Sequence, residues 1–388
     1  MTSEEKFKLI TRNLEEVLTE EELRALLESG QPPKHYIGFE ISGKLHIGYL
    51  FTCLKVKDLQ DAGAETIIWL ADLHSAINDK LDGNIETIRK VARGYFTDAF
   101  KALFQCVGGD PEKLQFKLTS EEYAKNPDFW LTMLEIGKTT TLARTKRSVT
   151  IMGREESDDI DTAKLFYPIM QAADIFLLGV NIAHAGVDQR KVHVIARDSA
   201  SALGKPKPVA IHHPILLGLT PSILKISVHE EIKVQGKTSV SLDQGEIIPN
   251  EEEDIRDKIA MKSKMSKSKP GSGISIHDSP DQIRQTINGA YTPEGQIENN
   301  PILNWTRYLI FYGEGSLTIS RKPEHGGDIT YNSYDDLEKD YVEKNLHPQD
   351  LKMAVSEWLI KKLEPARDYF EDPKRKSALE EIERLTSA

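Results

Sequence analysis

The spacing of apolar and polar positions predicts a helix close to the start of the chain. Thr19 and Glu22 form a capping box, and leucines follow at helical spacing, so that one face of the segment is apolar. Gly30, followed shortly by two prolines, ends this pattern. We therefore expect the opening of the chain to be helical.

Further along, short apolar runs alternate with helical patterns. Residues 66–71 are almost continuously apolar, which is typical of a strand buried on both faces of a parallel sheet. Other strands are predicted at residues 36–40, 114–118, 180–185 and 209–215. Strands that alternate with helices indicate a Rossmann-like α/β fold, whose open parallel sheet binds ligands at the carboxyl ends of its strands.

Two regions interrupt this alternation. Residues from about 85 to 160 are mostly helical in pattern and indicate a helical insertion with a surface of its own, whereas residues 220–261 are polar and predict an extra loop or peripheral hairpin. From about residue 279 the pattern becomes helical again. We therefore predict an α/β domain over residues 1–278 and an α-helical domain over residues 279–388.

Composition and charge exclude several classes of protein. No apolar run approaches the length of a membrane span, and the first residues lack the basic and apolar regions of a signal peptide. The two cysteines, Cys53 and Cys106, are too few for a disulfide framework or a cysteine-built zinc site, so we expect a cytoplasmic protein without a resident metal. The net charge of −11 argues against indiscriminate nucleic-acid binding but leaves room for local basic patches.

The first candidate for chemistry is the segment 43–48 (GKLHIG), here called the histidine-glycine loop, which follows the first predicted strand and precedes a helix. A turn of this kind directs free backbone N–H groups and the positive helix end toward a phosphate. His46 offers an imidazole donor, while Gly43 and Gly48 allow close approach. Taken alone, the segment is explained equally well as an ordinary turn with a surface histidine.

The second candidate is the segment 264–268 (KMSKS), here called the lysine-serine loop. Lys264 and Lys267 would close on the pyrophosphate end of ATP as charge develops there, and the proline and glycines that follow permit such motion. A flexible basic linker is the alternative explanation, and taken alone the segment favours it.

Together the two loops resemble the signature of class I aminoacyl-tRNA synthetases. The segments 36–40 (YIGFE), 167–171 (YPIMQ) with Asp174, and 188–193 (DQRKVH) are similar to tyrosyl-tRNA synthetases of the archaeal and eukaryotic type. The resemblance covers essentially the whole chain except residues 220–261. It implies a catalytic α/β domain, an anticodon-binding helical domain, and an enzyme that activates L-tyrosine with ATP and transfers it to tRNA(Tyr).

The resemblance also assigns the tyrosine pocket. Tyr36 and Asp174 would hold the substrate phenol, while the α-amino end would be bound by Tyr167, Gln171 and Gln189. The first assignment is chemically sound, because a phenol hydroxyl both donates and accepts a hydrogen bond. Core roles for Tyr167 and Gln171, which are i, i+4 neighbours on a helix, are the alternative. Three polar groups on one face of an apolar helix are costly unless they meet a ligand.

For the nucleotide, the resemblance implies that Lys264, Lys267 and His46 are catalytic, with a magnesium ion brought by ATP. The residues that it assigns to ATP binding are Glu40, Gly43, His46, Gly48 and Lys267. One departure concerns Tyr49, since many relatives have a second signature histidine at this position.

Contacts to tRNA are implied at two places. Arg190 and Lys191 would meet the acceptor stem, or else form a solvated basic turn. His325, His347 and Asp350 would read the anticodon, and the alternative for Asp350 is helix capping. A basic stretch at residues 144–147 could follow phosphates or be a solvated helix face. The resemblance further implies a homodimer joined through the helical insertion.

Three other functions stay open at this point. A tryptophanyl-tRNA synthetase shares the fold and both loops, but Asp174 with Tyr36 favours a phenol over an indole, which only donates. A non-catalytic RNA-binding paralogue is supported by Tyr49 alone. A small nucleotidyltransferase is disfavoured by the lysine-serine loop and the C-terminal domain.

Overall fold

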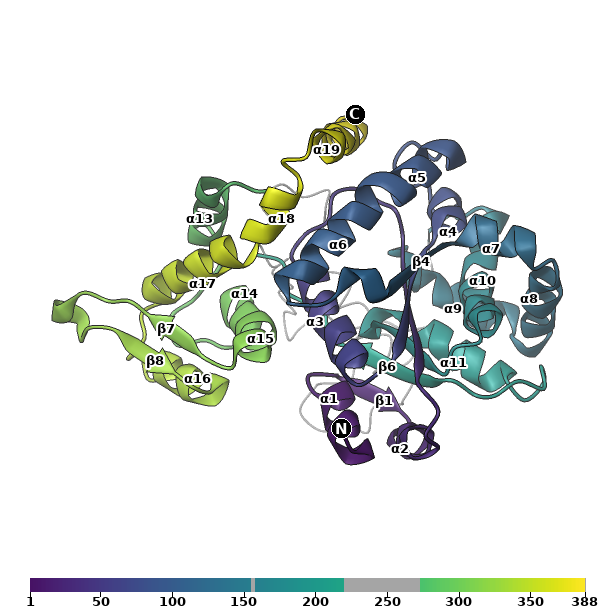
Figure 1. The fold of residues 1–388 in the computed structure, drawn as a ribbon, viewed down its shortest axis with the longest axis horizontal. Helices are drawn as coiled ribbons and strands as arrows, with labels where there is room; N and C mark the ends of the chain where they lie inside the picture. The colour runs from purple at the N-terminus through teal and green to yellow at the C-terminus, as the bar shows by residue number, and fades with distance from the viewer. Residues whose placement is uncertain (155–157, 220–272, 388) are drawn as a thin grey trace, which may run out of the picture.

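The computed structural model describes residues 1–154, 158–219 and 273–387. Its centre is a six-stranded sheet with the order β1-β6-β5-β2-β3-β4, in which β1 is antiparallel to β6 and all other neighbours are parallel (Figure 1). The strands are β1 (Glu16–Leu18), β2 (Lys34–Phe39), β3 (Glu65–Leu70), β4 (Leu114–Leu118), β5 (Ile182–Gly186) and β6 (Val209–His213). The predicted α/β fold with an open, mostly parallel sheet is confirmed.

Helices cover both faces of this sheet (Figure 1). In the first part of the chain they are α1 (Ser3–Thr11), α2 (Glu20–Glu28), α3 (Gly48–Asp61), α4 (Asp72–Ile77), α5 (Ile85–Val91), α6 (Thr97–Cys106), α7 (Thr119–Lys125), α8 (Asp128–Thr139), α9 (Leu142–Ser148), α10 (Thr162–Leu178) and α11 (Arg190–Ser199). Short helical turns join them: η1 (Ala92–Phe96), η2 (Pro111–Lys113), η3 (Val149–Met152) and η4 (Val187–Gln189). The capping box predicted at Thr19 and Glu22 is present and begins α2.

The C-terminal region is a body of helices beside the sheet (Figure 1). It contains α13 (Pro280–Asn288), α14 (Pro301–Trp305), η5 (Thr306–Phe311), α15 (Tyr312–Glu314), η6 (Pro323–His325), α16 (Tyr334–Val342), α17 (Pro348–Lys362), α18 (Glu364–Tyr369) and α19 (Pro373–Ser387). The expectation of helices alone is corrected by an antiparallel pair, β7 (Leu317–Ile319) and β8 (Ile329–Tyr331). Each strand is only three residues long, too short for a periodic pattern.

Two further differences concern the sheet. The opening of the chain is helical except for β1, a three-residue strand that pairs with β6 from the far end of the α/β region. In addition, β4 lies inside the stretch 85–160 that we expected to form a helical insertion, and it pairs with β3. Residues from about 85 to 118 thus belong to the connection between β3 and β4 and to β4 itself, and not to a separate insertion. The domain boundaries themselves stay a prediction.

Residues 220–261 and the lysine-serine loop, with Lys264 and Lys267, lie outside the described residues. None of the helices within the described ranges is long and apolar enough to cross a membrane.

Candidate active site

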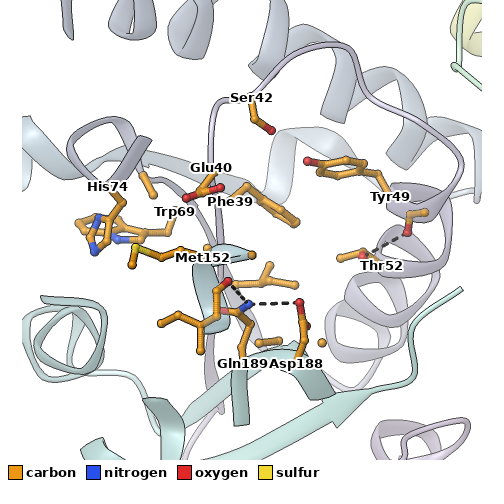
Figure 2. Close-up of a pocket in the computed structure, with 18 of the residues that line it drawn as sticks. Phe39, Glu40, Ser42, Tyr49, Thr52, Trp69, His74, Met152, Asp188 and Gln189 are labelled. Carbon is orange, nitrogen blue, oxygen red and sulfur yellow. Dashed lines mark hydrogen bonds between the residues drawn. The ribbon is translucent and has the colours of Figure 1, made fainter. Parts of the chain in front are cut away.

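A pocket of about 840 Å³ opens at the carboxyl ends of the central strands. Figure 2 shows Trp69 and His74 on one side of it, and Tyr49 and Thr52 of α3 on the other. Most of the residues predicted for substrates line this pocket: Tyr36, Glu40, His46, Gly48, Tyr167, Gln171, Asp174 and Gln189. They come from β2, the histidine-glycine loop, α10 and η4, so the fold brings together segments far apart in the chain.

Asp174 of α10 is the buried carboxylate at one end of the pocket. It is 1% exposed and accepts hydrogen bonds from Trp69 Nε1, at 2.9 Å, and from the Tyr123 hydroxyl. Burial raises the pKa of Asp174 to about 8, although these two hydrogen bonds act in the opposite direction. The carboxyl group therefore keeps its proton at pH values at which an exposed aspartate is ionised. Its hydrogen-bonding surroundings suit a polar ligand.

Tyr36 lies on β2, paired with β3 on one side and with β5 on the other. Its phenol is buried, and burial together with the charge of Asp174 raises its pKa, so the hydroxyl stays neutral. Tyr36 and Asp174 thus line the same pocket.

His74 of α4 is a pocket residue that sequence reasoning missed. It is 1% exposed, and within the described part of the chain neither ring nitrogen has a hydrogen-bond partner. Its Nε2 lies 3.6 Å from Asp174 Oδ2, and its ring packs edge-on against Tyr167. Burial lowers the pKa of His74 to about 4, so the imidazole is neutral. A buried polar ring without partners is costly, which points to a ligand at this place.

The residues predicted for the α-amino end form two hydrogen-bonded pairs. The Tyr167 hydroxyl donates to Glu40 Oε1 at 3.0 Å, and Gln171 Nε2 donates to Gln189 Oε1 at 3.3 Å. Gln189 is itself fixed, since its amide donates to the Ile151 carbonyl at 2.9 Å, as Figure 2 shows. The structure places Glu40, which we expected at the nucleotide, beside these residues.

The histidine-glycine loop is held by backbone bonds to a segment more than two hundred residues later. His46 forms an antiparallel bridge with Ser275, and the Ile47 amide donates to the Ile274 carbonyl at 3.0 Å. Gly43 does not line the pocket; its φ of 132° makes the turn, in a region that favours glycine.

Our expectation of free N–H groups at the start of α3 is wrong for this structure. The amide of Gly48 donates to His46 Nδ1 at 3.1 Å, and that of Tyr49 to the His46 carbonyl at 2.9 Å. A tight turn ahead of the helix uses these donors locally. The Tyr49 ring packs edge-on against His46 and tilted against Phe39, and burial raises the pKa of its phenol, which stays neutral.

The residues predicted for tRNA lie in two places. Arg190 begins α11, and its Nε donates to both carboxylate oxygens of Glu16 at 2.9 Å, so the guanidinium is turned toward β1. Lys191 follows it in the same helix. In the stretch 144–147, Arg144 pairs with Asp198.

At the other place, His347 caps α17, since its Nδ1 accepts the amide of Gln349 at 3.1 Å. Asp350 lies in the first turn of this helix but does not cap it, which corrects the capping alternative. His325 ends η6 in the connection between β7 and β8. Arg321 joins the two segments by donating to the carbonyls of Gly327 and Asn345.

Three histidines on neighbouring strands form a hydrogen-bonded chain that ends at the pocket, which the sequence pattern did not indicate. His35 Nε2 is hydrogen-bonded to His184 Nδ1 at 3.1 Å, and His184 Nε2 to His213 Nδ1 at 2.8 Å. His184 and His213 line the pocket. Burial lowers the pKa of His35 to about 3, and that of His184 is also lowered, so these rings are neutral.

The site thus combines a mostly parallel sheet, a pocket at the ends of its strands and a histidine-bearing turn. The family described as tRNA synthetases class I (W and Y) matches residues 28–364, and the chain belongs to this family. Within it, the chain is 47% identical to the tyrosine–tRNA ligase of Thermococcus sibiricus and 42% identical to that of Aeropyrum pernix. The alignments cover 96% of this chain and 96% of the former relative, and 98% and 97% for the latter.

Solved structures agree. The tyrosyl-tRNA synthetase of Pyrococcus horikoshii complexed with L-tyrosine is 45% identical, with a TM-score of 0.86 over 99% of this chain and 100% of that chain. The tryptophanyl-tRNA synthetase of Aeropyrum pernix is 17% identical, with a TM-score of 0.60 over 95% of this chain and 83% of that chain, and shares the fold.

Proposed function

We propose that this chain is a tyrosine–tRNA ligase, which activates L-tyrosine with ATP and transfers it to the 3′-terminal adenosine of tRNA(Tyr). The observation that carries the proposal is the buried Asp174 carboxyl group, which shares one pocket with the Tyr36 phenol. A tyrosine hydroxyl both donates and accepts a hydrogen bond, and these two residues offer one partner for each role. The indole of tryptophan would use only an acceptor.

Tyrosine would lie with its phenol at Asp174 and its α-ammonium group toward Tyr167, Gln171 and Gln189. The Gln171 Oε1 atom is buried and, among the described residues, has no hydrogen-bond partner, so it can accept a bond from the ammonium group. Glu40, whose Oε1 accepts the hydrogen bond of the Tyr167 hydroxyl, provides a carboxylate on the same side. This orientation leaves the substrate carboxylate facing the histidine-glycine loop.

In the first step the tyrosine carboxylate attacks the α-phosphorus of ATP in line, forming the acyl–phosphate bond of tyrosyl-adenylate as the bond to pyrophosphate breaks. ATP would be bound by Glu40, His46, Gly48 and Lys267, whereas Gly43 would act only by shaping the turn. We assign stabilisation of the developing phosphate charge to His46, Lys264 and Lys267. A magnesium ion bound to ATP would neutralise further charge on the phosphates.

In the second step a ribose hydroxyl at the 3′ end of the tRNA attacks the acyl carbon, and AMP leaves. Arg190 and Lys191 would contact the acceptor stem, and His325, His347 and Asp350 the anticodon. Arg321 supports the second assignment, because it holds the two anticodon segments together. A catalytic domain over residues 1–278 and an anticodon domain over residues 279–388 would then divide the work in a cytoplasmic enzyme.

A homodimer joined through the helical insertion is part of the proposal. Three large apolar side chains of α8 are exposed, namely Trp130 (46%), Leu131 (58%) and Leu134 (59%). These positions lie within about one turn of the same helix, so their side chains offer an exposed apolar surface that a partner subunit would cover.

The experiment is tRNA charging by the full-length protein with labelled tyrosine and ATP. Transfer of label to tRNA(Tyr), abolished by omission of ATP, supports the proposal. Formation of adenylate without transfer to any tRNA would contradict the second step, and preferential transfer of tryptophan would contradict the substrate.

A further inference from the structure

The last helix of the chain, α19, returns from the C-terminal body to the catalytic part. Figure 1 shows α18 and α19 (yellow) running toward α6 and α5, and the end of the chain lies near these helices. Ile382 of α19 is fully buried in the same apolar core as residues of the sheet. The helix α19 is therefore packed against the catalytic part of the chain through a buried side chain.

Two residues of α19 line the substrate pocket. Leu385 and Thr386 are the pocket residues contributed from beyond residue 216 among the described parts of the chain. They lie close to the histidine-glycine loop, because Glu383, which is less than one turn earlier in the same helix, is paired with Lys44 of this loop. In the proposed reaction this is the nucleotide end.

An ion pair ties the same helix to the histidine-glycine loop. Lys44 Nζ lies 2.9 Å from Glu383 Oε1, and the two side chains are 33% and 45% exposed. Lys44 is two residues before His46, so the pair fixes the loop at its turn. Asp278 also faces this ion pair. Its pKa is raised, mainly by burial; the charge of Lys44 lowers it and that of Glu383 raises it.

The loop is supported from the same side at a second point. The Leu45 amide donates to the buried Tyr95 hydroxyl at 3.0 Å, and this hydroxyl is hydrogen-bonded to His277 Nε2 at 2.9 Å. The His277 ring packs edge-on against Phe370, which directly follows α18. Residues 370–387, here called the C-terminal arm, thus contact the loop directly through the Lys44–Glu383 ion pair and indirectly through His277 and Tyr95.

We propose that α19 completes the adenylate-forming site: Leu385 and Thr386 wall its nucleotide end, and Glu383 is a positioning residue that acts through Lys44. This inference rests on the proposed function. It goes beyond it because a region expected to read the anticodon then also determines ATP binding in the absence of tRNA. An exposed ion pair contributes little to the free energy of folding. Removing this pair should therefore shift the position of the histidine-glycine loop and leave the stability of the protein unchanged.

The test measures tyrosine-dependent exchange of pyrophosphate into ATP by the full-length protein, without tRNA. Glu383→Gln is expected to raise KM for ATP about two- to fivefold, as follows from an exposed pair of up to about 1 kcal/mol. KM for tyrosine and the melting temperature stay unchanged. The matched control is Glu381→Gln, which removes the pair with Lys90 (2.5 Å) from the same helix but does not touch the loop.

A second variant tests the wall directly. Thr386→Trp adds bulk at the pocket and is expected to raise KM for ATP about tenfold through steric overlap, whereas Ser387→Trp adds the same bulk one residue further on and leaves it unchanged. Equal KM values within each pair of variants would overturn the inference. Absence of tyrosine-dependent exchange in the unaltered protein would instead overturn the proposed function.

Discussion

Asp174→Asn separates the role of Asp174 in binding from its effect on stability. The substitution keeps the shape of the side chain. Trp69 Nε1 can only donate, so the amide oxygen takes its hydrogen bond, and the amide nitrogen donates to the Tyr123 hydroxyl, which then accepts. The variant is therefore expected to fold.

The effect on stability follows from the raised pKa. Because burial raises the pKa of Asp174 from 3.8 to about 8, the folded state binds this proton more tightly than the unfolded state does. Between about pH 4 and pH 8 the unfolded state ionises first, so the folded state of the free protein loses stability as pH rises. The full difference corresponds to about 6 kcal/mol, and asparagine removes it.

The assay is urea unfolding of the ligand-free protein at pH 4, 6 and 9. The free energy of unfolding of the variant, relative to the unaltered protein, should increase from pH 4 to pH 9. In exchange assays near pH 7, where the buried carboxyl group is mainly neutral, the variant should lose about two- to tenfold in kcat/KM for tyrosine, the range given by about 0.5–1.5 kcal/mol for a neutral hydrogen bond. KM for ATP serves as the internal control. Parallel pH profiles, or unchanged kinetics with tyrosine, would refute this reasoning.

Two other predictions concern assembly and folding. If the proposed homodimer forms through α8, replacing both Trp130 and Leu134 by glutamate should give monomers in light scattering, because two charges then enter its exposed apolar side chains; a mass that does not change would exclude this interface. Asp58→Ala should lower the free energy of unfolding by about 3–5 kcal/mol in urea, because it leaves the Lys55 ammonium, 3.2 Å away and 0% exposed, buried without its carboxylate. The exposed pair at Lys57 is the control, and Lys57→Ala should change the value by less than about 1 kcal/mol; similar losses in both variants would contradict a buried charge pair.

Local sequence patterns were sufficient to predict the main strands and helices of the α/β domain. The apolar run at 66–71 became β3 because a strand buried on both faces needs apolar residues throughout, and the box at Thr19 became the start of α2. The strand β1 could not be predicted in this way, since its partner β6 lies almost two hundred residues away and its three residues carry no periodicity.

Some residues of the candidate active site could be predicted from the sequence, and others could not. Asp174 stood out because a carboxylate on an apolar helix face requires a partner, whereas Trp69 looked like any aromatic residue of a buried strand. His74 and the histidine chain at His35 and His184 depend on tertiary contacts between strands. Sequence spacing does not encode such contacts, so only the structure brings them into view.

The amino acid that this protein activates can be identified by exchange of pyrophosphate into ATP, with tyrosine, tryptophan and phenylalanine compared at equal concentration in the full-length protein. The pocket of Tyr36 and Asp174 predicts exchange with tyrosine and strong discrimination against the other two amino acids, which leave one of the buried groups unpaired. Exchange that is equal with phenylalanine, or faster with tryptophan, would contradict it.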